Sequence, residues 1–381
     1  MKVLHISNIV SHHQLPLARS ICSYVGVDNF RFAAMGLDNG ERSRNGWNTN
    51  ANEPWIIRPN ETEIDRAEFE RFWEDADVVL SGERLFEGML KRVSGGKLCF
   101  YMSERWWKPP IGMFRLIHPL FLTMVMKFFL LSKSPYFHCL PIGPFAAKDL
   151  RIFRHLRGRM WSWGYFTDLP DVSRDRVISS SVDEPLKVLW VGRMLALKSV
   201  DLLIKAVANV QDGGGRISLT LIGDGPERRR LERLAESLLD AASYKIKNFV
   251  PHTEVPKIMQ EHDVYVLPSN AYEGWGAVIN EAMGAGCAVI ASDMTGAGKA
   301  MIESSNNGFL FKSGSQADLA RCLNLLVGDQ KLLREISEQA IIDVSDFWSP
   351  NIAASRFLQV AEDVLAGRTS DRFSSGVMAR L

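Results

Sequence analysis

The sequence predicts an α/β protein with two consecutive domains, each built on a parallel β-sheet. Short apolar runs alternate with longer amphipathic segments along the chain, which is typical of parallel strands joined by crossover helices. A stretch rich in Asp, Ser and Pro, 168–186, has no helical periodicity and separates two halves. Because domains usually hold roughly 100–200 residues, a chain of 381 residues fits two domains.

Five strands are predicted in each half. They cover 2–7, 31–35, 77–81, 97–102 and 137–142 in the first half, and 187–192, 217–223, 248–250, 264–269 and 288–292 in the second. The predicted domains are 1–167 and 187–350, joined by a linker at 168–186. A C-terminal helix at 351–366 is expected to pack back toward the first domain, and the polar tail at 367–381 is expected to be flexible.

Composition excludes several classes of protein. A formal net charge of +1 provides no global basic field for nucleic acid, so no nucleic-acid partner is expected. Five scattered cysteines without zinc-ligand spacing indicate a reducing cytoplasm, and the start of the chain lacks the features of a signal peptide. No metal site is predicted, since the Asp75-Ala76-Asp77 sequence leads directly into a strand.

The apolar segment 117–134 is the part of the sequence considered for contact with a membrane. It is interrupted by Lys127 and falls short of the roughly 20 residues that a spanning helix needs. Arg115, Lys127 and Lys133 flank its apolar residues and suit a helix lying in an anionic membrane surface, so that peripheral contact through 115–133 is one interpretation. A buried helix of the first domain is the other.

The loop after the strand 187–192 carries two cations. Arg193 follows the strand, and Lys198 stands at the start of the next helix, whose free N–H groups already favour anions. In open parallel sheets, ligands bind beyond the carboxyl ends of the strands. We therefore predict a diphosphate clamp at Arg193 and Lys198, with an ordinary surface location as the alternative.

The loop after the strand 264–269 carries two carboxylates. Glycines in this loop let the backbone approach a ligand, and backbone N–H groups at the following helix start are expected to contact phosphate. The expected donor-binding positions here are Gly274, Trp275, Gly276 and Ala277. Carboxylates repel phosphate, so Glu281 is expected to accept hydrogen bonds from a ribose diol and Glu273 from a group beyond the phosphates. The predicted ligand is a nucleotide-diphosphate sugar, and helix capping or ion pairing is the alternative for each glutamate.

Four successive segments, VGRMLALKSVDLLIKA, LTLIGDGPERRRLERLA, FVPHTEVPKIMQEHDVYVLPS and EGWGAVINEAMGAGCAVIAS, resemble the donor-binding domain of the retaining GT-B glycosyltransferases of family 4. The resemblance implies two Rossmann-like domains facing each other across a cleft, with the acceptor bound by the first domain and the donor by the second. It implies diphosphate contacts for Arg193 and Lys198, a sugar contact for Glu273 and a ribose contact for Glu281. Gly192, Asp224 and His252, in the same segments, are assigned to donor binding. Ser199 and Trp275 depart from the glycine and phenylalanine that are common at these positions.

The first half resembles a subset of bacterial enzymes of capsule, exopolysaccharide or other surface glycan assembly. The resemblance is carried by SNIVSHHQLPLA (7–18), YMSERWWKPP (101–110) and WGYF (163–166). His13, with His12 as the neighbouring candidate, can bind a hydroxyl or act as a base, and capping of the first helix is its alternative role. Glu104 is the candidate for acceptor orientation or base chemistry. Sugar stacking and packing both stay open for Trp106 and Trp107.

These observations together predict a retaining, metal-independent hexosyltransferase. It would move a hexose or N-acetylhexosamine from a nucleotide-diphosphate sugar, a UDP-sugar first and GDP-mannose second, to a hydroxyl of a glycan or lipid-linked acceptor. The donor is a substrate, and no cofactor is expected. The expected location is the cytoplasm or the inner face of the plasma membrane. A non-catalytic nucleotide-sugar-binding scaffold and a GT-B sugar-nucleotide epimerase are the alternatives. A Rossmann dehydrogenase is disfavoured, because no GxGxxG follows the first strand.

Overall fold

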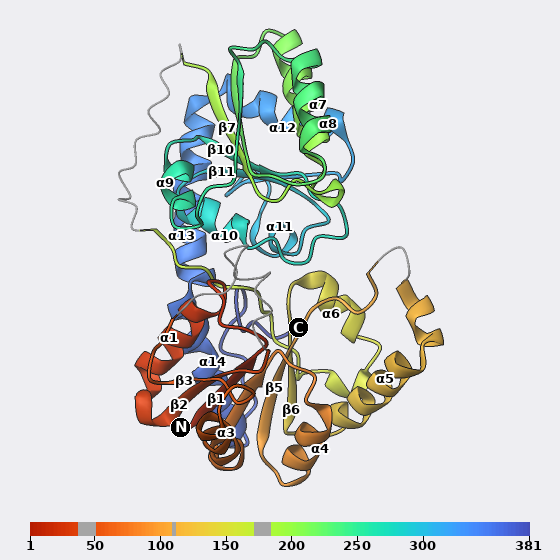
Figure 1. Ribbon diagram of the computed structural model, residues 1–381, viewed down its shortest axis with the longest axis vertical. Coiled ribbons are helices and arrows are strands. Elements are labelled where there is room, and N and C mark those ends of the chain that lie inside the picture. The colour runs from red at the N-terminus through yellow and green to blue at the C-terminus, as the bar shows by residue number, and fades with distance from the viewer. Residues whose placement is uncertain (37–50, 109–111, 171–183) are drawn as a thin grey trace. The chain divides into compact units, whose positions relative to one another are not determined.

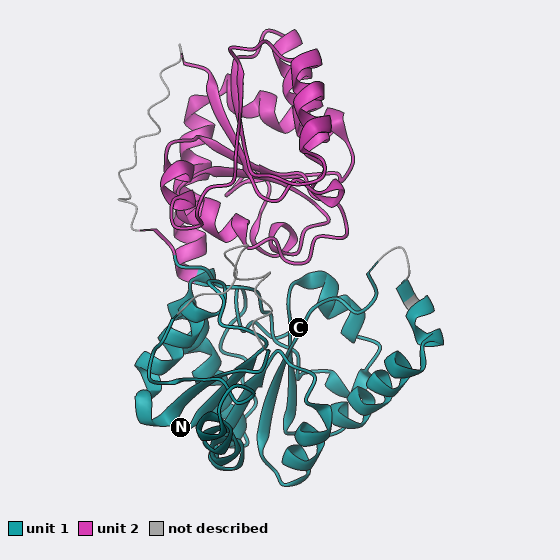
Figure 2. Ribbon diagram, viewed as in Figure 1, with its two compact units in different colours: residues 1–168, 347–381 teal, residues 169–346 magenta. Residues whose placement is uncertain are grey.

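The computed structural model describes residues 1–36, 51–108, 112–170 and 184–381 (Figure 1). They form two compact units, which Figure 2 distinguishes by colour. The first unit comprises Met1–Asp168 together with Phe347–Leu381, and the second comprises Leu169–Asp346. Most of the expected linker, 171–183, lies outside the described residues.

The first unit contains a six-stranded parallel sheet with the order β3-β2-β1-β4-β5-β6. The strands are β1 (Val3–Ser7), β2 (Phe30–Ala34), β3 (Ile56–Ile57), β4 (Val78–Ser81), β5 (Leu98–Ser103) and β6 (Phe137–Pro141). Every residue of β1, β4, β5 and β6 is buried. A parallel sheet covered on both faces requires apolar residues at successive positions, which is why these strands read as continuous apolar runs.

Helices from both ends of the chain complete the first unit. They are α1 (Leu15–Val25), α3 (Glu63–Asp75), α4 (Phe86–Ser94), α5 (Pro119–Ser132), α6 (Pro144–Leu150) and α14 (Pro350–Leu365), with 3-10 turns η1 (Val27–Asn29), η2 (Gly112–Ile117) and η3 (Arg154–Leu156). The C-terminal helix α14, blue in Figure 1, packs against α1, red. Ser349 begins α14 by accepting a hydrogen bond from the N–H of Ile352 at 3.4 Å.

The prediction of a flexible tail at 367–381 is wrong. Val377 and Met378 are 0% and 1% exposed. The N–H of Met378 donates to the carbonyl of Ser162 at 2.8 Å, and the N–H of Leu381 donates to that of Met160 at 3.0 Å. Two apolar residues in a polar stretch have no periodicity that a sequence pattern can detect, but their burial together with backbone pairing is enough to hold the tail in place.

The second unit contains another six-stranded parallel sheet, with the order β12-β11-β10-β7-β8-β9. The strands are β7 (Leu186–Val191), β8 (Ile217–Ile222), β9 (Tyr244–Lys247), β10 (Val264–Leu267), β11 (Ala288–Ser292) and β12 (Phe309–Phe311). Its helical elements are η4 (Ala196–Lys198), α7 (Val200–Asp212), α8 (Arg228–Leu238), α9 (Val255–Gln260), α10 (Val278–Gly284), α11 (Gly296–Met301), α12 (Gln316–Gly328) and α13 (Gln330–Trp348). Two parallel α/β domains therefore confirm the predicted fold class.

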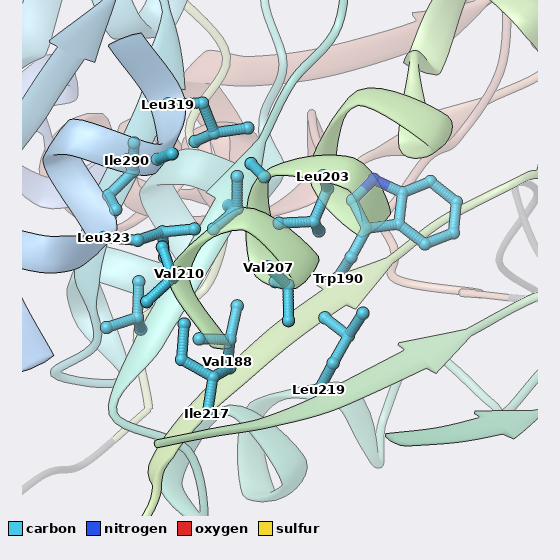
Figure 3. Packing of buried hydrophobic residues seen from close by; sticks show 14 of the residues in the cluster. Val188, Trp190, Leu203, Val207, Val210, Ile217, Leu219, Ile290, Leu319 and Leu323 are labelled. Carbon is cyan, nitrogen blue, oxygen red and sulfur yellow. The ribbon is translucent and has the colours of Figure 1, made fainter. Parts of the chain in front are cut away.

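The core of the second unit lies between this sheet and the helices that pack on it (Figure 3). Val188 and Trp190 of β7 meet Leu203 and Val207 of α7, and all four are fully buried. The spacing of Leu203 and Val207 places both on one face of α7. This packing fixes the start of α7 relative to the carboxyl end of β7, where the first candidate site residues lie.

Edge strands account for the errors in strand prediction. No strand forms at 248–250, and β9 lies at Tyr244–Lys247 instead, where half-buried and exposed residues alternate. Two further short edge strands, β3 in the first sheet and β12 in the second, were not predicted. Strands at an edge carry a weaker apolar signal than central ones because they have a neighbour on one side only.

Among the residues that the structure describes, no helix is both long and apolar enough to cross a membrane. The segment expected to contact a membrane forms η2 and α5. Phe128 and Leu131 of α5 are buried, whereas Leu120, Met126 and Leu130 are 76%, 60% and 51% exposed. The helix thus belongs partly to the core of the first unit and leaves much apolar surface in water.

Candidate functional site

The first group of candidate residues follows β7. Arg193 is exposed. Lys198 is the last residue of η4, and the next residue, Ser199, occupies the N-cap position of α7. Ser199 adopts left-handed backbone angles, φ 49° and ψ 40°, which glycine tolerates better than serine. This conformation turns the chain into α7 directly after Lys198. Lys198 therefore lies near the positive end of a 13-residue helix, where an anion is favoured.

The loops after β7 and β8 lie in close contact. The N–H of Met194 donates to the carbonyl of Asp224 at 2.8 Å. A Cβ at Gly223 would collide with the backbone of Gly192, and one at Gly225 would collide with that of Met194, so glycine is required at both positions. The predicted donor-binding residues Gly192 and Asp224 are thereby brought together, and the Asp224 side chain accepts from the N–H of Gly225 at 2.7 Å.

The turn after β10 is held against η4. The N–H of Asn270 donates to the carbonyl of Leu197 at 2.9 Å, and the N–H of Glu273 donates to the carbonyl of Asn270 at 3.0 Å. Lys198 Nζ then lies 2.5 Å from Glu273 Oε2, in an ion pair whose side chains are 20% and 13% exposed. The structure therefore joins two residues that sequence analysis assigned to different parts of the donor. Their positions are 75 residues apart, so no local pattern signals the pair.

Trp275 anchors the turn before α10. Its ring is 2% exposed, and Nε1 donates to Oδ1 of the buried Asn280 at 2.9 Å. The carbonyls of Gly274 and Trp275 accept from the N–H groups of Gly296 and Ala297, at the start of α11, at 3.2 and 2.8 Å. The indole therefore positions the turn from inside. Any contact of Trp275 with a ligand would have to come from its backbone.

Gly276 and Ala277 lead into α10. Gly276 has φ 86°, and a Cβ there would lie 2.8 Å from the Leu267 side chain, so both the conformation and the space require glycine. Ala277 stands at the N-cap of α10. Glu281, in the first turn of this helix, has its pKa raised to about 7 by burial.

Tyr265 lies in the sheet, within electrostatic reach of Glu273 and Glu281. This fully buried residue of β10 donates its hydroxyl to the carbonyl of Val191 at 3.2 Å. Its pKa is raised well above the usual value by burial and then by the charges of Glu281 and Glu273. Tyr265 is not among the predicted site residues, because a tyrosine within an apolar strand has the pattern of an ordinary core residue.

His252 occupies a different part of the sheet edge. It lies in the turn between β9 and α9, where its carbonyl accepts from the N–H of Val255 at 3.3 Å. Because β9 is the edge strand and β7 and β10 are neighbours near the middle, His252 stands two strands away from the loop of Arg193. Its part in donor binding stays a prediction.

A second group forms in the first unit. Tyr165 donates its hydroxyl to Glu104 Oε1 at 2.7 Å, and its ring stacks on His13 with the centroids 6.2 Å apart. The rings of His12 and His13 lie 3.8 Å apart. Burial, and then the charge of Glu104, raise the pKa of Tyr165 well above its usual value, so it stays a proton donor in neutral solution. The structure thus joins His13 and Glu104 through Tyr165, which the sequence offers only as part of the WGYF segment.

Asp149 of α6 fixes the loop that carries Glu104. Its buried carboxylate accepts from the N–H groups of Trp106 and Trp107 at 2.9 and 3.1 Å. The Trp106 ring is 5% exposed, and the Trp107 ring packs edge-on against Phe121 with the centroids 5.5 Å apart. Packing is therefore the role that the structure gives to both tryptophans. Asp149 was missed because nothing in the sequence connects it with a loop more than 40 residues earlier.

The chain is similar to known glycosyltransferases in sequence and in fold. The family of glycosyl transferases group 1 matches residues 171–343, which include every candidate donor residue named above. The match spans almost the whole of the second unit. HepE of Anabaena, solved in complex with UDP, superimposes with a TM-score of 0.69 at 16% identity, covering 95% of this chain and 100% of that one. The fold is that of the GT-B glycosyltransferases.

Curated relatives match about half of the chain. Alpha-D-kanosaminyltransferase of Streptomyces kanamyceticus is 33% identical over 187 residues, 49% of this chain and 45% of the relative. A Campylobacter jejuni relative, N,N'-diacetylbacillosaminyl-diphospho-undecaprenol alpha-1,3-N-acetylgalactosaminyltransferase, is 26% identical over 185 residues, 49% of this chain and 46% of the relative. The chain thus spans less than half the length of either relative.

Proposed function

We propose that this protein is a retaining, metal-independent glycosyltransferase. It transfers a hexose or N-acetylhexosamine from a nucleotide-diphosphate sugar to a hydroxyl of a glycan or lipid-linked acceptor. The observation that carries this proposal is the ion pair of Lys198 and Glu273, which joins the loops after neighbouring strands β7 and β10 in the region that matches group 1 glycosyltransferases; Arg193 lies in the first of these loops.

The cluster suits the charge that develops when a nucleoside diphosphate departs. Arg193, Lys198 and the N-terminus of α7 supply positive charge for the leaving phosphates. Glu273, next to Lys198, offers carboxylate oxygens to sugar hydroxyls, and Glu281 offers them to the ribose diol. In the absence of donor, Lys198 neutralises Glu273, so the carboxylate does not repel the incoming diphosphate at full strength. Donor binding would redirect the ammonium from Glu273 to phosphate.

The group in the first unit supplies the acceptor side of the proposal. His13 can orient the acceptor hydroxyl or accept its proton, and Glu104 can accept a hydrogen bond from the same hydroxyl. Tyr165, which donates to Glu104 at 2.7 Å, holds one carboxylate oxygen in place. The other oxygen lies 3.4 Å from Lys108 Nζ. In a retaining transfer of this kind, the leaving phosphate itself assists in removing the acceptor proton, so these residues act chiefly by orientation.

A UDP-sugar is the first candidate for the donor and GDP-mannose the second. HepE, the structural neighbour described above, is solved with UDP. The name of the Campylobacter relative contains a diphospho-undecaprenol, which favours a lipid-linked acceptor and a part in surface polysaccharide or capsule synthesis. We also propose a peripheral contact of 115–133 with an anionic membrane, at the cytoplasmic face, supported by the exposed apolar residues of α5.

A ligand screen tests the donor site. Purified protein would be mixed with UDP-, GDP-, ADP-, dTDP- and CMP-sugars, and thermal unfolding and donor hydrolysis would be measured for each. One nucleotide-sugar should stabilise the wild type but not Arg193→Ala or Glu281→Ala, while Arg233→Ala, an exposed arginine of α8, should behave as wild type. Absence of stabilisation by any nucleotide-sugar would refute the donor site.

The stereochemistry and the metal requirement are tested separately. NMR of the product should show the anomeric configuration of the donor, and transfer should persist in EDTA. Inversion of the configuration, or loss of transfer in EDTA, would refute the respective part of the proposal. Isomerisation of the donor sugar without acceptor would indicate an epimerase instead, and donor binding without turnover under any acceptor would indicate a scaffold.

A further inference from the structure

A groove of about 1520 Å³ lies in the first unit between α3, the start of α4, η2 and α5. Its lining includes Phe69, Trp73 and Phe121, which pack on the core of this unit and remain partly exposed. A Cβ on Gly88 of α4 would lie 2.9 Å from the Trp73 ring, so α4 packs tightly against Trp73. None of the residues that we assign to glycosyl transfer lines this groove. It is therefore a separate feature.

One wall of the groove is unusually apolar for a surface in water. Phe114, Ile117 and Leu120 all line it, and they are 74%, 80% and 76% exposed. Removing such side chains from water is favourable, so three of them in one hollow provide a driving force for binding an apolar ligand. Scattered exposed hydrophobic residues need no explanation, but a concave group of them marks a binding surface.

Positive charge is concentrated in the segment of the chain that contributes η2 and α5 to this groove. Residues 105–167 contain ten Lys and Arg and a single acidic residue, Asp149. This segment, which includes η2 and α5, therefore carries a formal charge of +9 in a chain whose net charge is +1. The rest of the chain carries −8. Such a basic segment is attracted to an anionic surface even though the protein as a whole is nearly neutral.

Part of this positive charge lies directly beside α5. The ring of His155 in η3 packs against Phe129 of α5 with the centroids 5.7 Å apart. Arg159, shortly after η3, donates to the carbonyl of Ser132 at 2.7 Å and so links this part of the chain to the end of α5. Three arginines of this basic turn, residues 151–157, are exposed, namely Arg151, Arg154 and Arg157. The C-terminal end of α5, where Phe129 is partly exposed, thus lies next to a turn that carries exposed cations.

The groove itself combines apolar walls with cations. Arg84 and Arg115 line it, and Lys127 of α5 lies 2.5 Å from Glu87 of α4 in an ion pair at its margin. Its volume exceeds the roughly 300–1,000 Å³ of pockets for drug-sized ligands. An elongated hydrocarbon needs apolar area and few hydrogen bonds, whereas its phosphate needs nearby cations. Glu70 and Glu74 of α3 line the groove as well, so the phosphate belongs on the α5 side.

We propose that this groove seats a hydrocarbon chain of an anionic membrane lipid, while α5 lies in the membrane surface and the basic turn contacts lipid headgroups. The inference rests on the membrane contact of 115–133 proposed above and not on the donor reaction. It assigns to the first unit a lipid-binding site that is distinct from both groups of transfer residues.

Fluorescence quenching by lipids with brominated chains tests the proposal. Full-length protein would be mixed with phosphatidylglycerol vesicles, with and without bromine on the chains, and with phosphatidylcholine vesicles. Wild type should sediment with the anionic vesicles, and bromine should quench its tryptophan emission. Trp73→Phe should still sediment but lose most of this quenching, whereas Trp348→Phe, in α13, should keep it.

Leu120→Asp provides a second variant in case Trp73→Phe does not fold. Leu120 is mostly exposed, so the change should not affect folding. A charge in the apolar wall of the groove should exclude the hydrocarbon chain of the lipid and abolish the quenching. Leu325→Asp, at an exposed leucine of α12, is the matched control. Equal quenching in wild type, Trp73→Phe and Leu120→Asp, or no sedimentation of wild type with anionic vesicles, would overturn the proposal. No nucleotide-sugar is present, so this result is independent of the donor screen.

Discussion

Removing the ammonium of Lys198 while keeping the carboxylate of Glu273 should lower the free energy of unfolding of the second unit. The two charged atoms lie 2.5 Å apart, and the side chains are 20% and 13% exposed. At an effective dielectric constant of about 20, the Coulomb attraction at this distance is about 7 kcal/mol, most of which offsets the desolvation of both groups. Breaking a buried pair from one side costs about 3–5 kcal/mol, whereas an exposed pair contributes about 0–1 kcal/mol. For this mostly buried pair, we expect Lys198→Met to lower the free energy of unfolding by about 1–3 kcal/mol.

A double-mutant cycle measures this effect. Urea unfolding would be followed for wild type, Lys198→Met, Glu273→Gln and the double variant. Lys331→Met is the control, because the Lys331 side chain is 85% exposed. The double variant should be more stable than Lys198→Met, since it leaves no uncompensated carboxylate. Additivity of the two single changes within about 0.3–0.5 kcal/mol would refute the reasoning.

The same variants separate stability from donor binding. The double variant should fold nearly as well as wild type and yet bind the selected nucleotide-sugar much more weakly, because it has lost a phosphate contact and a sugar contact together. Calorimetric titration measures the affinity. Wild-type affinity in a well-folded double variant would remove Lys198 and Glu273 from the donor site.

Three further changes test single residues. Ser199→Val should lower the free energy of unfolding by about 1–2 kcal/mol, because a β-branched residue is disfavoured at φ 49°, and Ser199→Gly should not; equal thermal midpoints for the two variants would contradict this. Tyr165→Phe should slow transfer by about tenfold or more, because it removes a hydrogen bond to the charged Glu104, while donor affinity stays unchanged. Steady-state kinetics decide this, and an unchanged transfer rate would exclude Tyr165. The charged form of Glu281 is disfavoured by burial, so its folded-state pKa of about 7 lies above the ordinary 4.5. The stability of the free protein should therefore fall as pH rises from about 4.5 to about 7, and donor affinity should rise between about pH 6 and pH 8 as the carboxylate ionises. Thermal unfolding and calorimetry should show both trends in wild type and neither in Glu281→Gln.

The central strands and the loops after them could be predicted from the sequence because both depend on local patterns. Buried parallel strands are continuous apolar runs, and Arg193 and Glu273 lie in the loops that follow two of them. The edge strand β9 could not be placed, because its half-exposed residues carry no comparable pattern. The same holds for the tail, where Val377 and Met378 belong to an apolar run too short to predict an element.

Contacts between distant residues are the second kind of feature that the sequence could not supply. Glu104 was selected as a candidate, but its hydrogen bond with Tyr165 joins residues 61 positions apart. Asp149 holds the Glu104 loop from another helix. Such partners depend on the order of strands in the sheet, which a list of strand segments does not determine.

The return of α14 to the first unit has a consequence for synthesis of the chain. About 180 residues separate Asp168, where the first stretch of this unit ends, from Phe347, where its second stretch begins. At roughly 5–20 residues per second, the ribosome needs ~9–36 s to produce them. During that interval, the surface of α1 that later contacts α14 has no covering helix. The second unit can complete its own sheet in the meantime, so the domain that is begun first is finished last.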